Sequence, residues 1–210
     1  MVIYGTIIRI WEGDRMNHKG TVLLETERLI LRKFTPEDAE PMFRNWANDT
    51  DVTRFLTWPP HGTIDNTRKV IDLWVNSYEE LSHYSWAIEL KSLGEPIGSI
   101  AAMNPNDKVS SVEIGYCIGK AWWGQGYVAE ALRAIVKFLF EDVGVNRMNA
   151  IHDPRNPNSG AVMRKAGFTF EAAKRQAGFN NLGICDHCEY GYLAEDYFKD
   201  KQAFCPCVFQ

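Results

Sequence analysis

Apolar positions recur along the chain with two spacings, and each spacing predicts a different element. Leu29 and Leu31 alternate with charged residues, which predicts a strand at about 22–34. An N-terminal signal of Thr35, Pro36 and Asp38 predicts a helix at about 36–48. Apolar residues three and four positions apart predict another helix at about 64–81. The chain therefore opens with a strand and two helices.

Three short apolar runs follow these helices. They cover 85–90, 96–103 and 111–118, and turn-forming residues separate them at Gly94 and at 104–107. Short turns of this kind join strands that pair antiparallel. We therefore expect a meander of three antiparallel strands.

The most regular apolar stripe begins after Gly126 and ends at Gly144. Its members have helical spacing and are Val128, Ala131, Leu132, Ile135, Val136, Leu139, Phe140 and Val143. A glycine directly after such a stripe is typical of a helix C-terminus. This stripe predicts a helix of about 16 residues.

The remaining chain predicts a strand at 147–152, a short helix at 157–166 and a last strand pair at 168–175 and 187–193. The expected order is βααβββαβαββ, an α/β fold with a mixed sheet. No linker divides residues 21–198, so we expect one domain. We interpret residues 1–20 as an extension of unknown role and residues 199–210 as a tail.

Composition narrows the class of protein. Apolar residues make up 45% of the chain, and the formal charge is −4 without a basic run, which argues against a nucleic-acid partner. The longest stretch without a charged residue has eleven residues, whereas a membrane-spanning helix needs about 18 or more. The first eight residues are apolar but lack the basic start of an export signal. We expect a cytoplasmic protein without a membrane partner.

The cysteines allow two interpretations. Five is an odd number, which favours reduced thiols over a disulfide framework. Cys185, His187 and Cys188, followed by Cys205 and Cys207, also approach the spacing of a zinc ribbon. We favour reduced thiols and no bound metal, and zinc stays open as the alternative.

Gly124-Gln125-Gly126 stands directly before the long helix. Glycines let consecutive backbone N–H groups point at one ligand, and the helix N-terminus adds a partial positive charge of about +0.5. Such a nest of N–H groups suits a phosphate. A nucleoside-triphosphate loop is excluded because no Lys-Ser/Thr pair follows the glycines.

A dinucleotide-binding turn fits the same residues in part. Gly124, Gly126 and Ala129 match G-x-G-x-x-A, and Asp153 ends the next strand. However, antiparallel strands precede the motif, few residues follow Asp153, and the bulky Trp123 stands where that turn is tight. The pyrophosphate of coenzyme A is the better candidate.

Four segments carry a resemblance to a known family: 24–40, 86–100, 112–132 and 146–168. In this order they resemble the GNAT superfamily of N-acetyltransferases, and within it the branch that acetylates ribosomal-protein N-termini. The resemblance covers about residues 22–195. It implies a single GNAT-like domain whose mostly antiparallel sheet contains a central, splayed pair of parallel strands.

The resemblance also implies a cofactor site. The pyrophosphate would be held by Trp123, Gly124, Gln125, Gly126, Tyr127 and Val128, through backbone N–H groups. Pantetheine would lie between the splayed strands beside Cys117 and Ile118, hydrogen-bonded like an added strand. Ala121 stands where the family often has Gln or Arg, so one side-chain contact to the phosphates is lost.

Catalytic roles follow from the same resemblance. Met163 replaces the tyrosine that often protonates the leaving thiolate, so that role passes to Ser159, with Asn156 bonding the pantetheine arm. Glu113, on the strand that would face the thioester, is our candidate base, alongside the alternative of an ordinary exposed carboxylate. A backbone N–H near Cys117 or Ile118 would meet the developing oxyanion.

The acceptor is expected to be an amine. In this family the loop that holds Phe55 and Trp58 lines the acceptor groove, and we place Tyr116 with them, beside the cofactor. We expect an acetyl-CoA-dependent enzyme that acetylates a protein or peptide α-amine, such as a ribosomal-protein N-terminus. A small-molecule amine acceptor, a catalytically silent acyl-CoA-binding module and a homodimer stay open.

Overall fold

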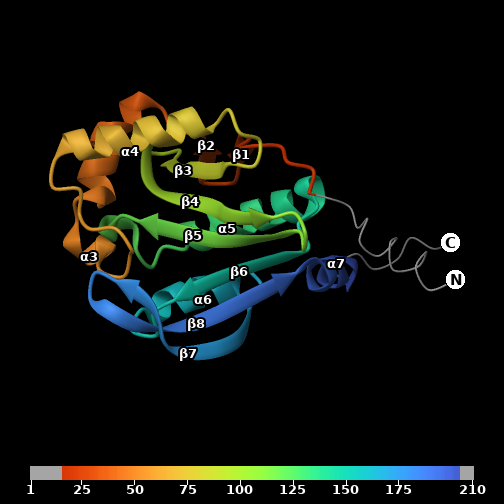
Figure 1. The fold of residues 1–210 in the computed structure, drawn as a ribbon. Coiled ribbons are helices and arrows are strands. Elements are labelled where there is room, and N and C mark those ends of the chain that lie inside the picture. The colour runs from red at the N-terminus through yellow and green to blue at the C-terminus, as the bar shows by residue number, and fades with distance from the viewer. Residues whose placement is uncertain (1–15, 204–210) are drawn as a thin grey trace, which may run out of the picture.

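The predicted strands form one eight-stranded sheet in the computed structural model, which describes residues 16–203 (Figure 1). The strands are β1 (Leu24–Glu25), β2 (Leu29–Arg32), β3 (Tyr84–Leu90), β4 (Glu95–Asn106), β5 (Ser111–Ile118), β6 (Arg147–His152), β7 (Thr169–Asn180) and β8 (Gly183–Leu193). Their order in the sheet is β1-β2-β3-β4-β5-β6-β8-β7. Among the strands of residues 16–203, only β5 and β6 pair in parallel, so the expected meander and the mixed sheet are confirmed.

Helical segments cover both faces of this sheet. They are η1 (Pro36–Asp38), α2 (Ala39–Met42), η2 (Phe43–Ala47), α3 (Thr50–Thr53), α4 (Ile64–Ser77), η3 (Lys120–Trp122), α5 (Tyr127–Phe138), η4 (Leu139–Val143), α6 (Pro157–Lys165) and α7 (Ala194–Ala203). Helices α5 and α6 pack on one face, and the segments from η1 to α4 pack on the other.

Several predicted bounds change. The strand predicted at 22–34 is divided into β1 and β2, because Thr26 turns the chain: its hydroxyl oxygen accepts from the Leu29 N–H at 3.0 Å. Helix α4 ends at Ser77, and β7 and β8 both extend toward a tight turn. Short α3 and terminal α7 were not predicted.

The long apolar stripe is buried as expected. Seven of its side chains face the sheet from α5 and η4 in the larger core cluster: Ala131, Leu132, Ile135, Val136, Leu139, Phe140 and Val143. The eighth, Val128, is 7% exposed. Gly144 ends the helix with φ +79°, a left-handed conformation that glycine adopts without strain. The stripe therefore fixes α5 on the sheet and positions its N-terminus.

Contacts with the rest of the fold reach into both predicted terminal segments. Met16, inside the expected 1–20 extension, is 5% exposed and belongs to the larger core. At the other end, Lys201 Nζ of α7, inside the expected 199–210 tail, lies 2.6 Å from Glu141 Oε1. Residues 1–15 and 204–210 lie outside the described part of the chain. Within residues 16–203, no helix combines the length and hydropathy needed to span a membrane.

Candidate functional site

The glycine nest lies at the N-terminus of α5. Gly124 and Gly126 have φ of +74° and +83°, and a side chain added at Gly124 would meet open space. Gly126 is the N-cap residue of α5, whose first-turn N–H groups have no partners within the helix. The predicted phosphate site thus has the backbone conformation that its glycines suggested.

Arg28 and Glu130 fasten this loop to the sheet. The Arg28 guanidinium donates to the Gln125 carbonyl (Nη1 to O, 3.1 Å) and to Glu130 (Nε to Oε2, 2.7 Å), and it lies 4.3 Å from the Tyr127 ring centre. Thr26 Oγ donates to Glu130 Oε1 at 2.6 Å. Burial raises the pKa of Glu130, but the Thr26 and Arg28 hydrogen bonds lower it by more, so it lies below its usual value.

The parallel strands separate beside the nest. Pairing covers Ser111–Ile114 of β5 and Arg147–Ala150 of β6 and does not continue to the carboxyl ends of these strands. The predicted separation at Tyr116, Cys117 and Ile118 is therefore present. The Trp123 indole, 44% exposed, donates to the Ile118 carbonyl at 2.9 Å and closes the turn between β5 and the nest.

Tyr116 and Ser159 meet across this opening. Tyr116 Oη donates to the Ser159 carbonyl at 2.9 Å and lies 3.0 Å from Ser159 Oγ. Burial raises the pKa of Tyr116 well above its usual value, although the Ser159 hydrogen bond partly opposes this shift. Asn156 is the N-cap residue of α6, one helical turn before Ser159. Met163 is 1% exposed and packs in the core.

Glu113 and Cys117 lie on the opposite face of β5 from Tyr116. Side chains alternate along a strand, and the pairing of β5 with β4 is regular from Glu113 to Ile118. Glu113 Oε2 accepts from Asn104 Nδ2 at 3.3 Å. Cys117 Sγ lies 3.3 Å from Ser99 Oγ and packs against a smaller core cluster that contains Trp46 and Ile71. Burial raises the pKa of the Cys117 thiol.

Phe55 and Trp58 lie in the loop between α3 and α4, and the β7–β8 turn closes onto this loop. Asn181 Nδ2 donates to the carbonyls of Thr53 and Trp58, both at 2.8 Å. In turn, Asn180 Nδ2 donates to Asp153 Oδ2 at 2.8 Å. This contact was not predicted, although an Asn-Asn pair followed by Gly183 is a turn signal.

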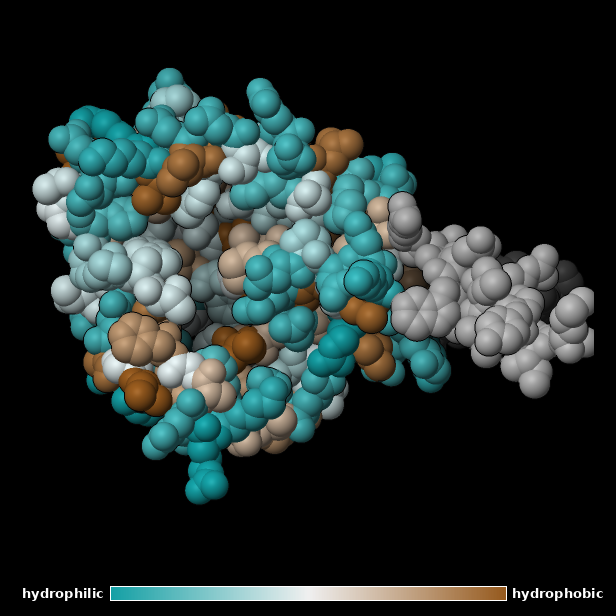
Figure 2. All heavy atoms as spheres, viewed as in Figure 1, coloured by the Kyte–Doolittle hydropathy of each residue, from teal (hydrophilic) through white to brown (hydrophobic). Residues whose placement is uncertain are grey.

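The loop and the hairpin tip form one side of the molecule. Figure 1 shows α3 beside the tip of the β7–β8 hairpin. In the space-filling view, apolar surface gathers over this tip, next to a hollow that separates it from the helical layer above (Figure 2). Exposed apolar side chains at the tip are Phe179, Leu182 and Ile184. Tyr116, by contrast, bonds to α6, so its contact with an acceptor stays a prediction.

Asp153 supports this hairpin from the β6–α6 loop. Its side chain is 2% exposed, and it accepts hydrogen bonds from the Arg155 side chain and from Asn180. The Arg155 hydrogen bond holds the pKa of Asp153 well below its usual value. Asp153 thus has the turn-forming role that suits its place at a strand end.

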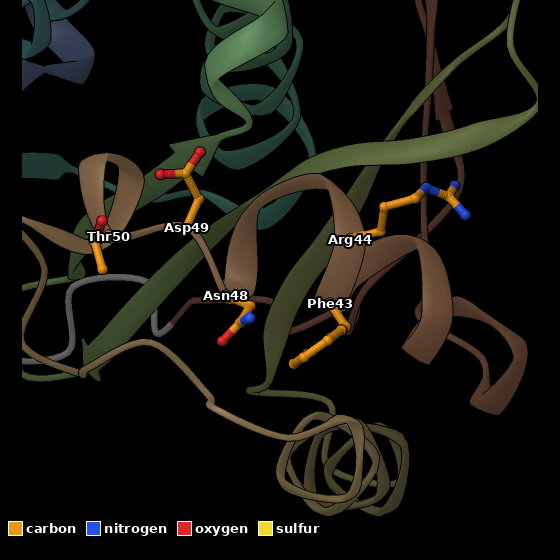
Figure 3. Close-up of a pocket in the computed structure, with 5 residues that line it drawn as sticks. All are labelled: Phe43, Arg44, Asn48, Asp49 and Thr50. Atoms are coloured by element: carbon orange, nitrogen blue, oxygen red, sulfur yellow. The ribbon is translucent and has the colours of Figure 1, made fainter.

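Two shallow pockets lie away from these residues. One, of about 410 Å³, is lined by Phe43, Arg44, Asn48, Asp49 and Thr50 (Figure 3). Its polar groups already serve the fold, since Asp49 caps α3 and Asn48 accepts from the Gly62 N–H. The other, of about 570 Å³, is lined by Lys174, Arg175 and Gln176. Neither pocket contains a predicted site residue.

Of the cysteine and histidine positions considered as zinc ligands, the structure describes three. Cys185, His187 and Cys188 lie along β8, and Cys205 and Cys207 fall outside the described residues. Within 16–203, no three His, Cys, Asp or Glu side chains group as a metal site would need. The described Cys117, Cys185 and Cys188 are free thiols.

Comparisons with known proteins agree with this geometry. A family model described as "Acetyltransferase (GNAT) domain" matches residues 28–169. An "Uncharacterized N-acetyltransferase YoaA" of Bacillus subtilis (strain 168) is 33% identical over 159 residues, which cover 76% of this chain and 89% of that protein. A "Ribosomal-protein-serine acetyltransferase" of Escherichia coli (strain K12) is 25% identical over 158 residues, covering 74% and 87%. The solved structure of "Microcin C7 self immunity acetyltransferase MccE in complex with Acetyl-CoA and AMP" shares the fold, with a TM-score of 0.72, 19% identity and coverage of 80% and 93%.

Proposed function

We propose, on the premise that this chain belongs to the GNAT family of acetyltransferases, that its acceptor is the α-amine of a protein or peptide N-terminus. Family membership makes the chain an acetyl-CoA-dependent N-acetyltransferase. The observation that carries the acetyl-CoA part of this proposal is the unfinished β5–β6 ladder, which opens between the glycine nest and Ser159.

Acetyl-CoA would occupy this opening from the nest inward. Its pyrophosphate would accept from the backbone N–H groups between Trp123 and Val128, where a helix N-terminus favours negative charge. Pantetheine amides would pair with backbone groups of Cys117 and Ile118, with Asn156 on the other side. The solved relative named with acetyl-CoA supports this cofactor for the shared fold.

The reaction would proceed by direct transfer. The neutral amine attacks the acetyl carbonyl, a C–N bond forms, and the C–S bond breaks with its electron pair left on sulfur. Glu113 takes the proton that the amine nitrogen loses, directly or through water, and the Ser159 hydroxyl donates a hydrogen bond to the departing thiolate. These residues approach from opposite faces of the sheet, because Glu113 and Tyr116 alternate on β5.

The acidity of the amine favours an α-amine acceptor. At pH 7, removing a proton costs about 1.4 kcal/mol for an α-amine of pKa about 8, and about 4.6 kcal/mol for a lysine of pKa about 10.4. A single carboxylate on a strand can therefore deprotonate an α-amine more readily than a lysine side chain. The relative named as a ribosomal-protein-serine acetyltransferase supports a protein acceptor.

A paired-peptide assay tests the acceptor. One peptide carries a free N-terminus and no lysine, and the other carries a blocked N-terminus and one lysine. We expect acetylation of the free N-terminus, with a higher kcat/KM at pH 7, measured by release of the CoA thiol and by peptide mass. Preference for the blocked peptide, or activity only on a small amine such as a polyamine, would overturn the proposed acceptor.

A further inference from the structure

Tyr116 holds Ser159 at two points. A phenol has a single hydrogen, and Tyr116 Oη donates it to the Ser159 backbone carbonyl at 2.9 Å. The second contact, 3.0 Å to Ser159 Oγ, is therefore donated by the serine hydroxyl. One tyrosine on the splayed part of β5 thus fixes both the backbone and the side chain of a residue on α6.

We propose that Tyr116 is a positioning residue that sets the Ser159 hydroxyl toward the thioester sulfur, an inference that rests on the proposed function. Ser159 is the third residue of α6, where a serine hydroxyl readily bonds to nearby backbone groups instead. The Tyr116 contact holds the oxygen on the side of the opening. The serine proton then needs only to rotate about the C–O bond.

The phenol bonded to Ser159 belongs to Tyr116 of strand β5, and α6 has no tyrosine one helical turn after Ser159. Met163, one helical turn after Ser159, is 1% exposed and packs in the core below α6. The neighbouring Tyr190 also lies in this region, but its hydroxyl accepts from Arg164 Nη1 at 2.6 Å. Tyr116 is therefore the tyrosine bonded to Ser159.

Proton balance in the leaving step needs no transfer from the phenol. When the C–S bond breaks, sulfur keeps the electron pair and leaves as a thiolate, and Ser159 turns its O–H from Tyr116 Oη to hydrogen-bond that sulfur while keeping its proton. Tyr116 keeps its own proton on the Ser159 carbonyl. Burial raises the pKa of Tyr116, so the phenol stays protonated across the neutral range and this hold persists.

A double-mutant cycle tests the coupling. Tyr116→Phe should lower kcat about tenfold while the Kd of acetyl-CoA changes less than about twofold. Because Tyr116 acts through Ser159, the double variant should be no slower than Ser159→Ala alone. Tyr190→Phe is the matched control: it removes the hydroxyl of a buried tyrosine bonded to Arg164 and should leave kcat within about twofold of the native value.

The outcomes separate this inference from the proposed function. Native protein that neither binds nor turns over acetyl-CoA would end the proposed function. A native enzyme whose Tyr116→Phe and Ser159→Ala defects multiply would show that Tyr116 acts independently of Ser159. A Tyr116→Phe variant with native kcat, or with weakened acetyl-CoA binding as its main defect, would also overturn the inference. Circular dichroism and thermal melting confirm that each variant is folded.

Discussion

Ser159 and Glu113, the proposed thiolate donor and the proposed base, lie on elements that approach the opening from different sides. Ser159 begins α6 and bonds to Tyr116, whereas Glu113 lies in the part of β5 that still pairs with β6. A change at one residue leaves the contacts of the other in place. Each proposed role can therefore be tested alone.

Ser159→Ala should lower kcat about tenfold to a hundredfold, because removing the hydroxyl leaves the thiolate without its donor. The acetyl-CoA Kd should change little, since backbone groups of the nest are proposed to make most of the contacts with the cofactor. Steady-state kinetics and calorimetric titration measure the two quantities. Ser77→Ala, which removes a hydroxyl at the exposed end of α4, is the control. Equal kcat in Ser159→Ala and native enzyme would assign the donor role to water.

Glu113→Gln should lower kcat/KM most near pH 7, where little of the amine is neutral. At pH 9 most of an α-amine is already neutral, so the variant should approach the native rate on a peptide N-terminus. With a lysine side chain it should stay far below, because only about 4% of that amine is neutral at pH 9. Paired pH-rate profiles measure this. A defect of constant size across pH would remove Glu113 from the base role.

The sequence predicted where these residues lie in the fold, but it did not predict which residues they contact. Ser159 and Asn156 were placed by the resemblance of one segment, and both lie at the start of α6 as expected. The Tyr116–Ser159 contact joins residues 43 positions apart. Periodicity reports which face a residue occupies and carries no information on such pairs.

At the scale of elements, the nest depends on backbone conformation and on charge together. Gly126→Asp should abolish detectable acetyl-CoA binding, because it places a carboxylate where the pyrophosphate would lie. It also forces a side chain into φ +83°. Gly144→Asp is the matched control: it imposes the same substitution at φ +79° at the other end of the α5–η4 helix, and it should keep native affinity. Calorimetry decides, and unchanged affinity in folded Gly126→Asp would contradict the predicted phosphate site.

The Glu130 carboxylate ties α5 to the β1–β2 turn, and its contribution should depend on pH. Its pKa is lowered in the folded state, so its stabilisation is present above the unfolded value of about 4.3 and is lost as pH falls through the folded pKa. Glu130→Gln should lower the free energy of unfolding by about 1–3 kcal/mol at pH 7. Urea unfolding at pH 7, 5 and 3 measures the difference in the free energy of unfolding between the native protein and Glu130→Gln. This difference should become smaller only at pH 3.

A pH-independent difference between native protein and Glu130→Gln would show that shape, and not charge, matters at this position. Glu195→Gln provides a control, because within the described residues the Glu195 carboxylate pairs with Lys199 on the exposed side of α7. Exposed pairs of this kind contribute little to the free energy of unfolding. Its unfolding curve should nearly match that of the native protein.

Elements with sustained periodicity were predictable, and short or backbone-driven ones were not. The stripe of α5 and η4 extends over four turns and gave both its ends correctly. Helix α3 has four residues, too few for a helical period. The tip of the β7–β8 hairpin lacks alternation and depends on backbone pairing and on Asn180, which Asp153 holds from a distant loop.

At the scale of the whole molecule, two connections bound the opening. On one side, the β5–β6 ladder joins the sheet halves over four residue pairs. On the other, Asn181 of the hairpin turn bonds to the loop after α3. Between these two connections β5 and β6 do not pair, and the elements around the opening are held together at both of its limits. This arrangement follows from topology, which local patterns do not encode.

The four-pair ladder also leaves the two halves of the sheet unconnected at the carboxyl ends of β5 and β6. A cofactor bound there would hydrogen-bond to both halves and would add to the interactions that hold them together. Saturating CoA should therefore raise the melting temperature, with about 2.7 kcal/mol of added stability at a hundredfold excess over Kd. On CoA binding, amide hydrogen exchange should slow in the unpaired parts of both strands, at Gly115–Ile118 and at Ile151–His152. Exchange in the outer β1–β2 pair should keep the rates of the CoA-free protein.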